Sequence, residues 1–329
     1  MKKKIILSFD YELFFGDKSG TVQKTLIEPT NKILDAMEAV GFKGNFFVDW
    51  QMLKYIMLEN DTRCQKDYIL LKEQLKDIIR RGHRIELHIH PHWVDAKYNG
   101  DGTWDFSIFR HYSLNSFTED DIQEMFVEGK NLLTGIAREV DTEYEIIAFR
   151  AGGWAIQPFY TLRNAFKAAG IKIDSSTMQG IKITTDYSSC DFLNMPFFID
   201  GYYRFKDSVE NPVDDGEFIE VPISSVKLPF LSRVIGKLNR TFFRPVLPLT
   251  DGTHTRTKDN PDKWEVAPRT GICTFSGLHP LDGILRLMNS KAGLICYIDH
   301  PKDFSRYTTA GIKAVAHISE SILYKDLLN

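Results

Sequence analysis

Three histidines lie close together at the end of a short apolar segment. The segment Gly82–His92 reads GHRIELHIHPH, with histidines at positions 88, 90 and 92. Histidine-rich tracts favour metal binding, because a buried imidazole without a partner is costly. A continuous strand would hold His88 and His92 roughly 13 Å apart, too far to share one ion.

Pro91 disfavours such a continuous strand, because proline lacks a ladder donor and fixes φ. We therefore expect the chain to leave the sheet near His88 and to curl. One helical turn would bring His88 and His92 within roughly 6 Å, so that both could bind one cation. The alternative is a polar, histidine-rich loop without a metal. The sequence assigns no role to His90.

Two carboxylates follow the first apolar segment of the chain. Lys4–Phe9 has the pattern of a buried strand, and Asp10 and Glu12 come directly after it. Residues two apart in an extended chain face the same way, so both carboxylates should emerge on one side. Two like charges so placed repel each other unless a cation lies between them. The alternative is an ordinary solvated loop.

Three later apolar segments also end in polar residues, namely Arg150, Asp174 and His300. A buried arginine requires a carboxylate partner. Asp174 could instead cap a turn, and a lone histidine such as His300 is commonly structural. In a parallel barrel the carboxyl ends of the strands form one face, so we expect these residues to converge with Asp10 and His88.

Apolar strand patterns alternate with amphipathic helix patterns, which indicates an α/β protein with parallel strands and right-handed crossovers. About seven strands are expected, and they begin near residues 4, 43, 84, 145, 171, 217 and 293. Each is followed by a helix or a long loop, as in a (β/α) barrel. The last helix is expected over about 308–328. We predict one domain, 1–329, with a divergent insertion at about 186–280.

Composition excludes several classes of protein. Of the 329 residues, 43% are hydrophobic, which is typical of a soluble globular protein, and the net charge of −3 argues against a general nucleic-acid binder. The apolar run after Met1–Lys4 ends at Phe9, which is too short for a secretory signal, and no run approaches a membrane span. Four cysteines without metal or redox spacing predict reduced thiols in a cytoplasmic protein.

Together these segments resemble the NodB-homology polysaccharide deacetylases, also called carbohydrate esterase family four. The family's motifs Thr-Phe-Asp-Asp-Gly, Gly-His-Glu-Ile-Gly-Asn-His-Thr-x-x-His, Arg-x-Pro-x-Gly and a final histidine motif are similar to Ser8–Glu12, Gly82–His92, Arg150–Trp154 and Tyr297–Pro301. The likeness extends over residues 4–304 in the order of the family, with a divergent stretch between about 176 and 280.

The chain departs from the family pattern at three motif positions. Tyr11 replaces the second aspartate of the first motif, so the metal carboxylate would come from Glu12. Ile89 replaces the hydroxyl residue of the second motif, and Gly152 replaces the proline of the third. The resemblance is therefore to an outlying member of the family.

The resemblance implies a distorted seven-stranded (β/α) barrel and a metal-dependent hydrolase that cleaves non-peptide C–N bonds. The expected reaction removes an N-acyl group, expected to be acetyl, from an amino sugar or a polysaccharide precursor. Zinc is the expected metal, on Glu12, His88 and His92, with one position left for water or a substrate oxygen.

The resemblance also implies the catalytic groups. Asp10 would be the general base and His300 the general acid that protonates the leaving amine. Arg150 would hold Asp10 in place, and Asp174 would be a carboxylate close to Arg150. His279, which also precedes a proline, is a weaker histidine candidate.

Two further segments bear on the substrate and its location. The long segment 93–117 is rich in aromatic residues and is expected to form the rim of a sugar-binding cleft, or else to pack onto the barrel. The segment 227–249 interleaves basic and apolar residues, so it could contact a membrane surface. The alternative is an outer helix or lid packed on the barrel. The aromatic residues of segment 93–117 include Trp93, Tyr98, Trp104, Phe106 and Tyr112.

Two other functions remain open from the sequence. Relatives of allantoinase type share the barrel, so the substrate could be a non-sugar amide or a cyclic imide. A carbohydrate-binding protein with a degenerate site is the second alternative, because Tyr11 and Ile89 stand at two usual motif positions.

Overall fold

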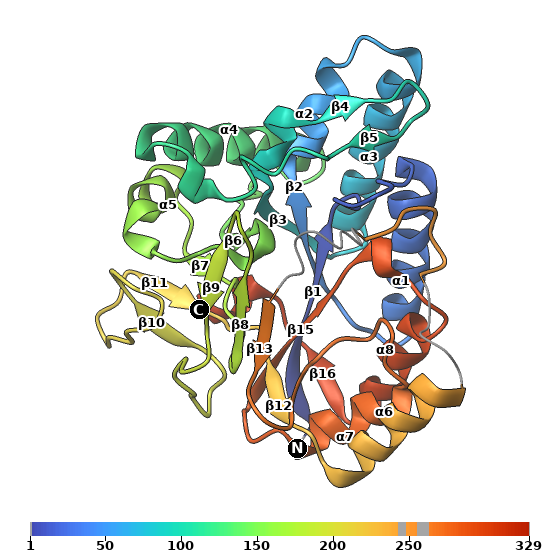
Figure 1. Ribbon diagram of the computed structural model, residues 1–329, viewed down its shortest axis with the longest axis vertical. Coiled ribbons are helices and arrows are strands. Elements are labelled where there is room, and N and C mark those ends of the chain that lie inside the picture. The colour runs from blue at the N-terminus through green and yellow to red at the C-terminus, as the bar shows by residue number, and fades with distance from the viewer. Residues whose placement is uncertain (1, 243–247, 255–262, 329) are drawn as a thin grey trace.

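The computed structural model describes residues 2–242, 248–254 and 263–328, and a curled, mostly parallel sheet lies at its centre (Figure 1). Its hydrogen-bonded order is β10-β11-β7-β6-β3-β2-β1-β15, and β16 pairs with the first residues of β1, on the same side as β2. Within this sheet, β10–β11 is the only antiparallel pair among the described strands. The strands are β1 Lys3–Tyr11, β2 Asn45–Asp49, β3 Arg84–Ile89, β6 Ala148–Ala151, β7 Ile173–Asp174, β10 Tyr203–Phe205, β11 Phe218–Glu220, β15 Leu294–Asp299 and β16 Ser319–Ser321.

The α/β class is confirmed, whereas the count of seven strands is not. The seven expected strands occupy consecutive places in the sheet, from β11 to β15, but β10 and β16 enlarge it. No strand pairing joins β11 to β15 among the described residues. Single backbone hydrogen bonds instead connect the segment after β11 to β15. Ser224 N donates to the Cys296 carbonyl oxygen at 2.9 Å, and Cys273 N donates to the Ser224 carbonyl oxygen at 2.8 Å. The sheet is therefore curled but open.

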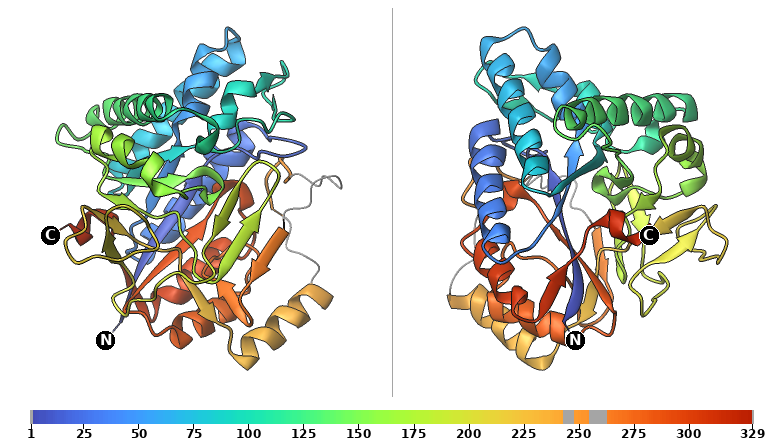
Figure 2. Two further views of the ribbon diagram at one scale, coloured as in Figure 1. Left: turned by 60° about the vertical axis from the view of Figure 1, so that its left-hand side comes forward. Right: turned by 180° about the vertical axis from the view of Figure 1, so that it is seen from behind.

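Helices surround the sheet (Figures 1 and 2). They are α1 Glu28–Glu38, α2 Trp50–Leu58, α3 Thr62–Arg80, α4 Glu119–Arg138, α5 Arg163–Ala169, α6 Phe230–Phe242, α7 Pro280–Asn289 and α8 Thr308–Ala316. The expected helix over 308–328 is too long, because α8 ends at Ala316 and the chain then forms β16 against the first residues of β1. None of the helices in the described ranges is long and apolar enough to cross a membrane.

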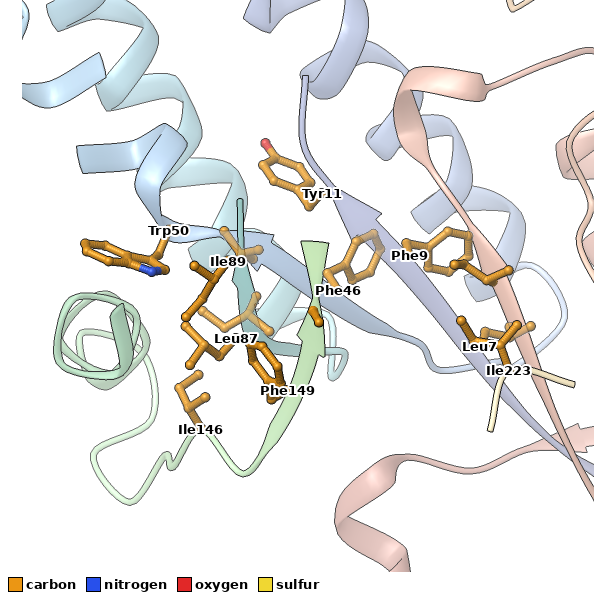
Figure 3. Packing of buried hydrophobic residues seen from close by; sticks show 14 of the residues in the cluster. Leu7, Phe9, Tyr11, Phe46, Trp50, Leu87, Ile89, Ile146, Phe149 and Ile223 are labelled. Atoms are coloured by element: carbon orange, nitrogen blue, oxygen red, sulfur yellow. The ribbon is translucent and has the colours of Figure 1, made fainter. Parts of the chain in front are cut away.

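Side-chain alternation along β1 separates the core from the site. Leu7, Phe9 and Tyr11 are fully buried in the hydrophobic core (Figure 3), whereas Ser8 and Asp10 face the inside of the curled sheet. The hydroxyl of Tyr11 donates to Gln74 Oε1 of α3 at 2.6 Å. Tyr11, which replaces the second aspartate of the first motif, is therefore a core residue and does not line the cavity.

The segment 186–280 contributes to two small sheets beside the main one. In the left view of Figure 2 the yellow-green strands β8 Ile181–Thr184 and β9 Ser189–Asp191 lie beside the orange strand β13 Lys263–Val266. The second sheet pairs β12 Ser225–Lys227 with β14 Thr270–Ile272. The structure forms helix α6 within the segment 227–249, for which membrane contact and a packed outer helix or lid were both open; residues 243–247 lie outside the described ranges. All four cysteines are free and buried.

Candidate active site

The carboxyl ends of four parallel strands bring the predicted residues together. β1 leads to Asp10 and Glu12, β3 carries His88, β6 carries Arg150, and His300 follows β15. With the exception of Arg150, which lies fully buried behind it, these side chains line a cavity of about 650 Å³. The convergence expected for the ends of parallel strands is therefore found for these five residues.

Glu12 lies at the centre of a group that could hold a metal ion. Its Oε2 atom lies 2.5 Å from His90 Nε2 and 3.2 Å from His88 Nε2. The ligand atoms of Glu12, His88 and His90 all lie within 4.8 Å of one another. A second such group among the described residues consists of Asp10, Glu12 and His300. One carboxylate and two imidazoles are a common ligand set for a catalytic divalent metal.

Hydrogen bonding and burial orient His88 and keep His90 neutral, as metal ligation requires. His88 Nδ1 lies 2.7 Å from the Arg150 carbonyl oxygen, which can only accept, so Nδ1 carries hydrogen and Nε2 faces Glu12. Burial lowers the pKa of His90 to about 4, so its imidazole is neutral at physiological pH. Burial also disfavours imidazolium at His88, but the hydrogen bond with Glu12 and the charge of Asp10 outweigh it and raise the pKa of His88. The pKa values of the two histidines are therefore shifted in opposite directions.

His90, and not the predicted His92, joins Glu12 and His88. β3 continues to Ile89, so the period of two places His88 and His90 on the same face. The predicted curl begins only at Pro91, in the 3₁₀ helix Pro91–Asp95, which carries His92 away. The His92 ring stacks on Tyr112 at 5.5 Å, and neither of its nitrogens has a hydrogen-bond partner in the described structure. The prediction of the curl was therefore misplaced along the chain.

Gly152, at the proline position of the third motif, makes room for His90. A methyl group at position 152 would lie 2.6 Å from His90 Nδ1 and 2.5 Å from the Ile89 carbonyl oxygen. Both distances are shorter than a carbon atom tolerates, so the histidine ring requires glycine here. The departure from the family motif and the use of His90 are thus linked by packing.

We expect Gly152→Ala to lower the free energy of unfolding by about 1–3 kcal/mol through overpacking, and to lower metal content by displacing His90. Thermal unfolding and metal analysis of the purified variant measure both effects. Gly135→Ala in α4 is the matched control, because a methyl group there meets nothing within 4 Å and favours the helix. Wild-type stability and metal content in Gly152→Ala would contradict the packing argument.

Asp10 forms a buried ion pair with Arg150. Arg150 Nη1 donates to Asp10 Oδ1 at 2.5 Å, and Nη2 donates to Ser8 Oγ at 2.8 Å. The Arg150 Nε atom donates to the Ser175 carbonyl oxygen at 2.7 Å, so the guanidinium is held on several sides. Burial raises the pKa of Asp10, but the charge of Arg150 and the hydrogen bond with His300 outweigh it and hold the pKa below its ordinary value. Asp10 is therefore ionised.

His300 occupies the other side of Asp10. Its Nε2 atom lies 3.4 Å from Asp10 Oδ2, and its Nδ1 atom lies 3.5 Å from Asp303 Oδ2. Asp303 in turn accepts from His254 Nε2 at 2.7 Å. Burial lowers the pKa of His300, but the hydrogen bond and charge of Asp10 outweigh it, so the pKa lies above its ordinary value. His300, with its raised pKa, thus faces the cavity beside the ionised Asp10.

Asp174 does not lie against Arg150 as expected. In the sheet Asp174 pairs with Phe149, the neighbour of Arg150, so its side chain points to the face opposite the guanidinium. Its carboxylate accepts from the Ser176 hydroxyl (2.7 Å) and lies beside Glu220, its partner in β11. Ser176 Oγ also accepts from Ala151 N at 2.9 Å. Asp174 therefore supports the backbone after Arg150 and does not reach the cavity.

Lys302 and Asp49 belong to the site although the sequence analysis missed them. Lys302 is buried, and its Nζ donates to Glu12 Oε1 at 2.6 Å. A single lysine two residues after His300 carries no pattern that could have identified it. Asp49 ends β2 opposite His88, accepts from Trp93 Nε1 at 2.6 Å, and has a pKa that burial raises to about 7. The rule used for the other strand ends would have found Asp49.

The predicted aromatic rim is partly confirmed. Trp93, Trp104 and Phe106 are buried and pack against one another, as the alternative required, whereas Tyr112 lines the cavity. The small sheet β13-β8-β9 supplies an opposite wall that the sequence did not indicate. His279 does not line the cavity, and its Nδ1 accepts from Leu281 N at 3.3 Å as the cap of α7. The other aromatic residues of the cavity wall are Phe15, Phe109, Trp154, Tyr187 and Trp264.

Comparison with known proteins agrees with this fold. No protein-family model and no curated protein matches the sequence. Among solved structures, a protein assigned as a polysaccharide deacetylase from Mycobacterium smegmatis aligns with 98% of this chain and 87% of its own, at 15% identity and a TM-score of 0.50. The chain has the polysaccharide deacetylase fold. The resemblance seen in the motifs is thus confirmed at the level of the fold.

Two further solved structures are also similar to this chain. The 4-alpha-glucanotransferase from Thermococcus litoralis aligns with all of this chain but with 40% of its own, at 14% identity and a TM-score of 0.54. A family 4 carbohydrate esterase from Streptomyces lividans in complex with acetate aligns with 96% of this chain and 87% of its own, at 10% identity and a TM-score of 0.40. Because the fold hosts different reactions, the activity has to be argued from the site.

Proposed function

We propose that the protein is a metal-dependent hydrolase that removes an N-acyl group, expected to be acetyl, from an amino sugar or a glycan precursor. The observation that supports this most is the position of Asp10. One of its oxygens is held by the buried Arg150, and the other faces the cavity beside His300 and the Glu12, His88 and His90 group. Such a charged, oriented carboxylate next to a metal-ligand set is suited to hydrolysis.

Glu12, His88 and His90 would hold the metal, with zinc as the expected ion. A bound divalent ion would polarise the acyl carbonyl and lower the pKa of a water molecule. Lys302 binds Glu12 Oε1, so Oε2 is the oxygen that faces the two imidazoles. The family motif would instead use His92, which the structure places against Tyr112 and Phe15.

The proton transfers would fall to Asp10 and His300. Ionised Asp10 would accept a proton from the attacking water, and Arg150 fixes the direction of its carboxylate. His300, with its raised pKa, would donate a proton to the nitrogen of the leaving amine. The two groups lie 3.4 Å apart and thus can serve the same reacting centre from one side.

The cavity wall supports a sugar substrate. Aromatic rings offer apolar faces on which a sugar ring packs, and a small set of polar groups then fixes its orientation. A volume of about 650 Å³ is suited to a small ligand or the end of a glycan. Because all four cysteines are free and buried, we also propose a reducing compartment such as the cytoplasm.

The test is a screen for acetate release from N-acetylated amino sugars and short glycans. We expect release with at least one of them, its loss after treatment with a chelator, and its return when zinc is added. Ring opening of a cyclic imide without acetate release would favour the amidohydrolase alternative. Glycan binding by a protein that holds no metal and releases no acetate would contradict the proposed function.

A further inference from the structure

An unusual surface lies on the side of α6 and α7 that faces away from the sheet. Three large apolar side chains of α6 are exposed, and Phe230 is the most exposed of them, at 74%. Leu281 and Met288 of α7 are also exposed, and α7 packs beside α6. Single exposed apolar residues are common, but five on two adjacent helices form a candidate interaction surface. We call it the α6–α7 face; its apolar residues are Phe230, Leu231, Leu238, Leu281 and Met288.

The charge on the α6–α7 face is positive. The segment 227–250 contains no aspartate or glutamate, and Lys227, Arg233 and Lys237 are exposed. The Arg233 guanidinium lies 5.6 Å from the centre of the Phe230 ring, so basic and apolar groups share the same surface. In the segment 279–293 the only acidic residue is Asp282, which is buried and accepts from Arg286.

The basic amino-terminal segment joins this end of the molecule. Lys3 Nζ donates to the Ser290 carbonyl oxygen directly after α7, and Lys2 and Lys4 are exposed beside it. Figure 1 shows the N terminus, α6 and α7 along the lower edge. In β16, the residue paired with Lys4 is the acidic Glu320, and the residues paired with Lys3 and Ile5 are serines.

We propose that the α6–α7 face binds the surface of a membrane that contains anionic phospholipids. The apolar side chains of α6 and α7 would enter the headgroup region, while Lys227, Arg233 and Lys237 would contact the phosphates. A second copy of the chain is a poorer partner, because pairing this face with itself would bring like charges together. An anionic surface is complementary in both charge and polarity.

This binding would leave the cavity open to water. The face lies near the first residues of β1, whereas Asp10 and Glu12 lie at the opposite end of that strand, which at about 3.3 Å per residue is roughly 25 Å away. The proposal does not depend on the proposed hydrolase, since it rests on different residues. Its consequence is that the protein would be held at a membrane with its site facing the aqueous side.

The test is cosedimentation of the full chain with phosphatidylcholine vesicles, with and without phosphatidylserine. We expect binding only to the vesicles with phosphatidylserine, and weaker binding as salt rises. The variant Arg233→Glu with Lys237→Glu should bind at least about tenfold more weakly, because each basic residue near the surface contributes appreciably. Lys66→Glu with Lys97→Glu carries the same charge change on exposed residues elsewhere, and should bind like the wild type.

A third variant separates the apolar contribution from the charge. Phe230→Ser with Leu231→Ser keeps all basic residues and should also weaken binding to the phosphatidylserine vesicles. Equal binding to both kinds of vesicle, or none to either, would overturn the proposal. So would wild-type binding by the Arg233 and Lys237 variant. If vesicles are not bound and sedimentation equilibrium shows a dimer that Phe230→Ser with Leu231→Ser disrupts, the face is instead an interface between two copies.

Discussion

Replacing Asp10 with asparagine should lower the turnover number by about 10²–10⁴, the range by which a positioned general base accelerates a reaction. The asparagine retains an oxygen that can accept from Arg150 Nη1, but its amide cannot take a proton from water. Asp10 is not among the three ligands that we propose for the metal. Steady-state acetate release and metal content are therefore expected to respond differently, with activity lost and metal retained.

Two measurements make this result interpretable. Thermal unfolding of Asp10→Asn establishes that the protein tested is folded, because the substitution leaves the Arg150 charge without a formal counter-ion. Asp207→Asn provides the control, since Asp207 pairs with Arg163 at the surface and does not line the cavity, and it should leave turnover unchanged. Near wild-type activity in folded Asp10→Asn would exclude Asp10 as the base.

Replacing Arg150 with methionine should cost about 3–5 kcal/mol in the free energy of unfolding, the usual effect of removing one partner of a buried ion pair. Arg150 is fully buried and holds Asp10, Ser8 and Ser175, so its loss leaves a buried carboxylate without a positive partner. Acetate release should fall as well, because the Asp10 carboxylate loses the group that fixes its direction. Urea unfolding measures the stability change.

The double variant with Arg150→Met and Asp10→Asn tests the cause of this instability. If the cost arises from the unpaired carboxylate, neutralising position 10 should recover part of the stability, so the two single effects should not add. Arg163→Met is the surface control, because the half-exposed pair of Arg163 with Asp207 should contribute no more than about 1 kcal/mol. A similar loss in Arg163→Met and Arg150→Met would contradict the special role of the buried pair.

The residues that the sequence identified best are those at the ends of apolar strands. Asp10, Arg150 and His300 could be placed at one face because parallel strands share a carboxyl edge, and this rule requires no side-chain detail. Tyr11 shows the same rule at work, since the period of two sends it to the core while Asp10 and Glu12 face the site. The order of the strands therefore predicts much of the site.

Whether His90, His92, Asp174 and Lys302 reach the site depends on geometry that could not be predicted from the sequence. The choice between His90 and His92 turns on whether β3 ends at His88 or at Ile89, a shift of one residue that Pro91 alone does not decide. Asp174 points away from Arg150 because of its register with Phe149, and register is a property of pairing. Lys302 reaches Glu12 across 290 residues of chain, a contact for which no local signal exists.

The divergent segment 186–280 was the least predictable part. The strands of the sheet β13-β8-β9 are only three or four residues long, and β13 is far from the other two in sequence, so the wall that this sheet adds to the cavity could not be predicted from pattern. The strand count was wrong for a related reason, because β10 and β16 are three-residue strands at the edges of a sheet. Short edge elements are set by tertiary contacts more than by local preference.

The central claim is that Glu12, His88 and His90 form one metal site, and zinc binding by the wild type, His90→Ala and His92→Ala tests it most directly. Removing an outer-shell partner already costs about 10–100-fold in metal affinity, so loss of a direct ligand should exceed about a hundredfold. We predict tight zinc binding by the wild type, loss of more than about a hundredfold in His90→Ala, and a change of less than about tenfold in His92→Ala. Zinc binding that is retained in His90→Ala and lost in His92→Ala, or absent from the wild type, would contradict the account.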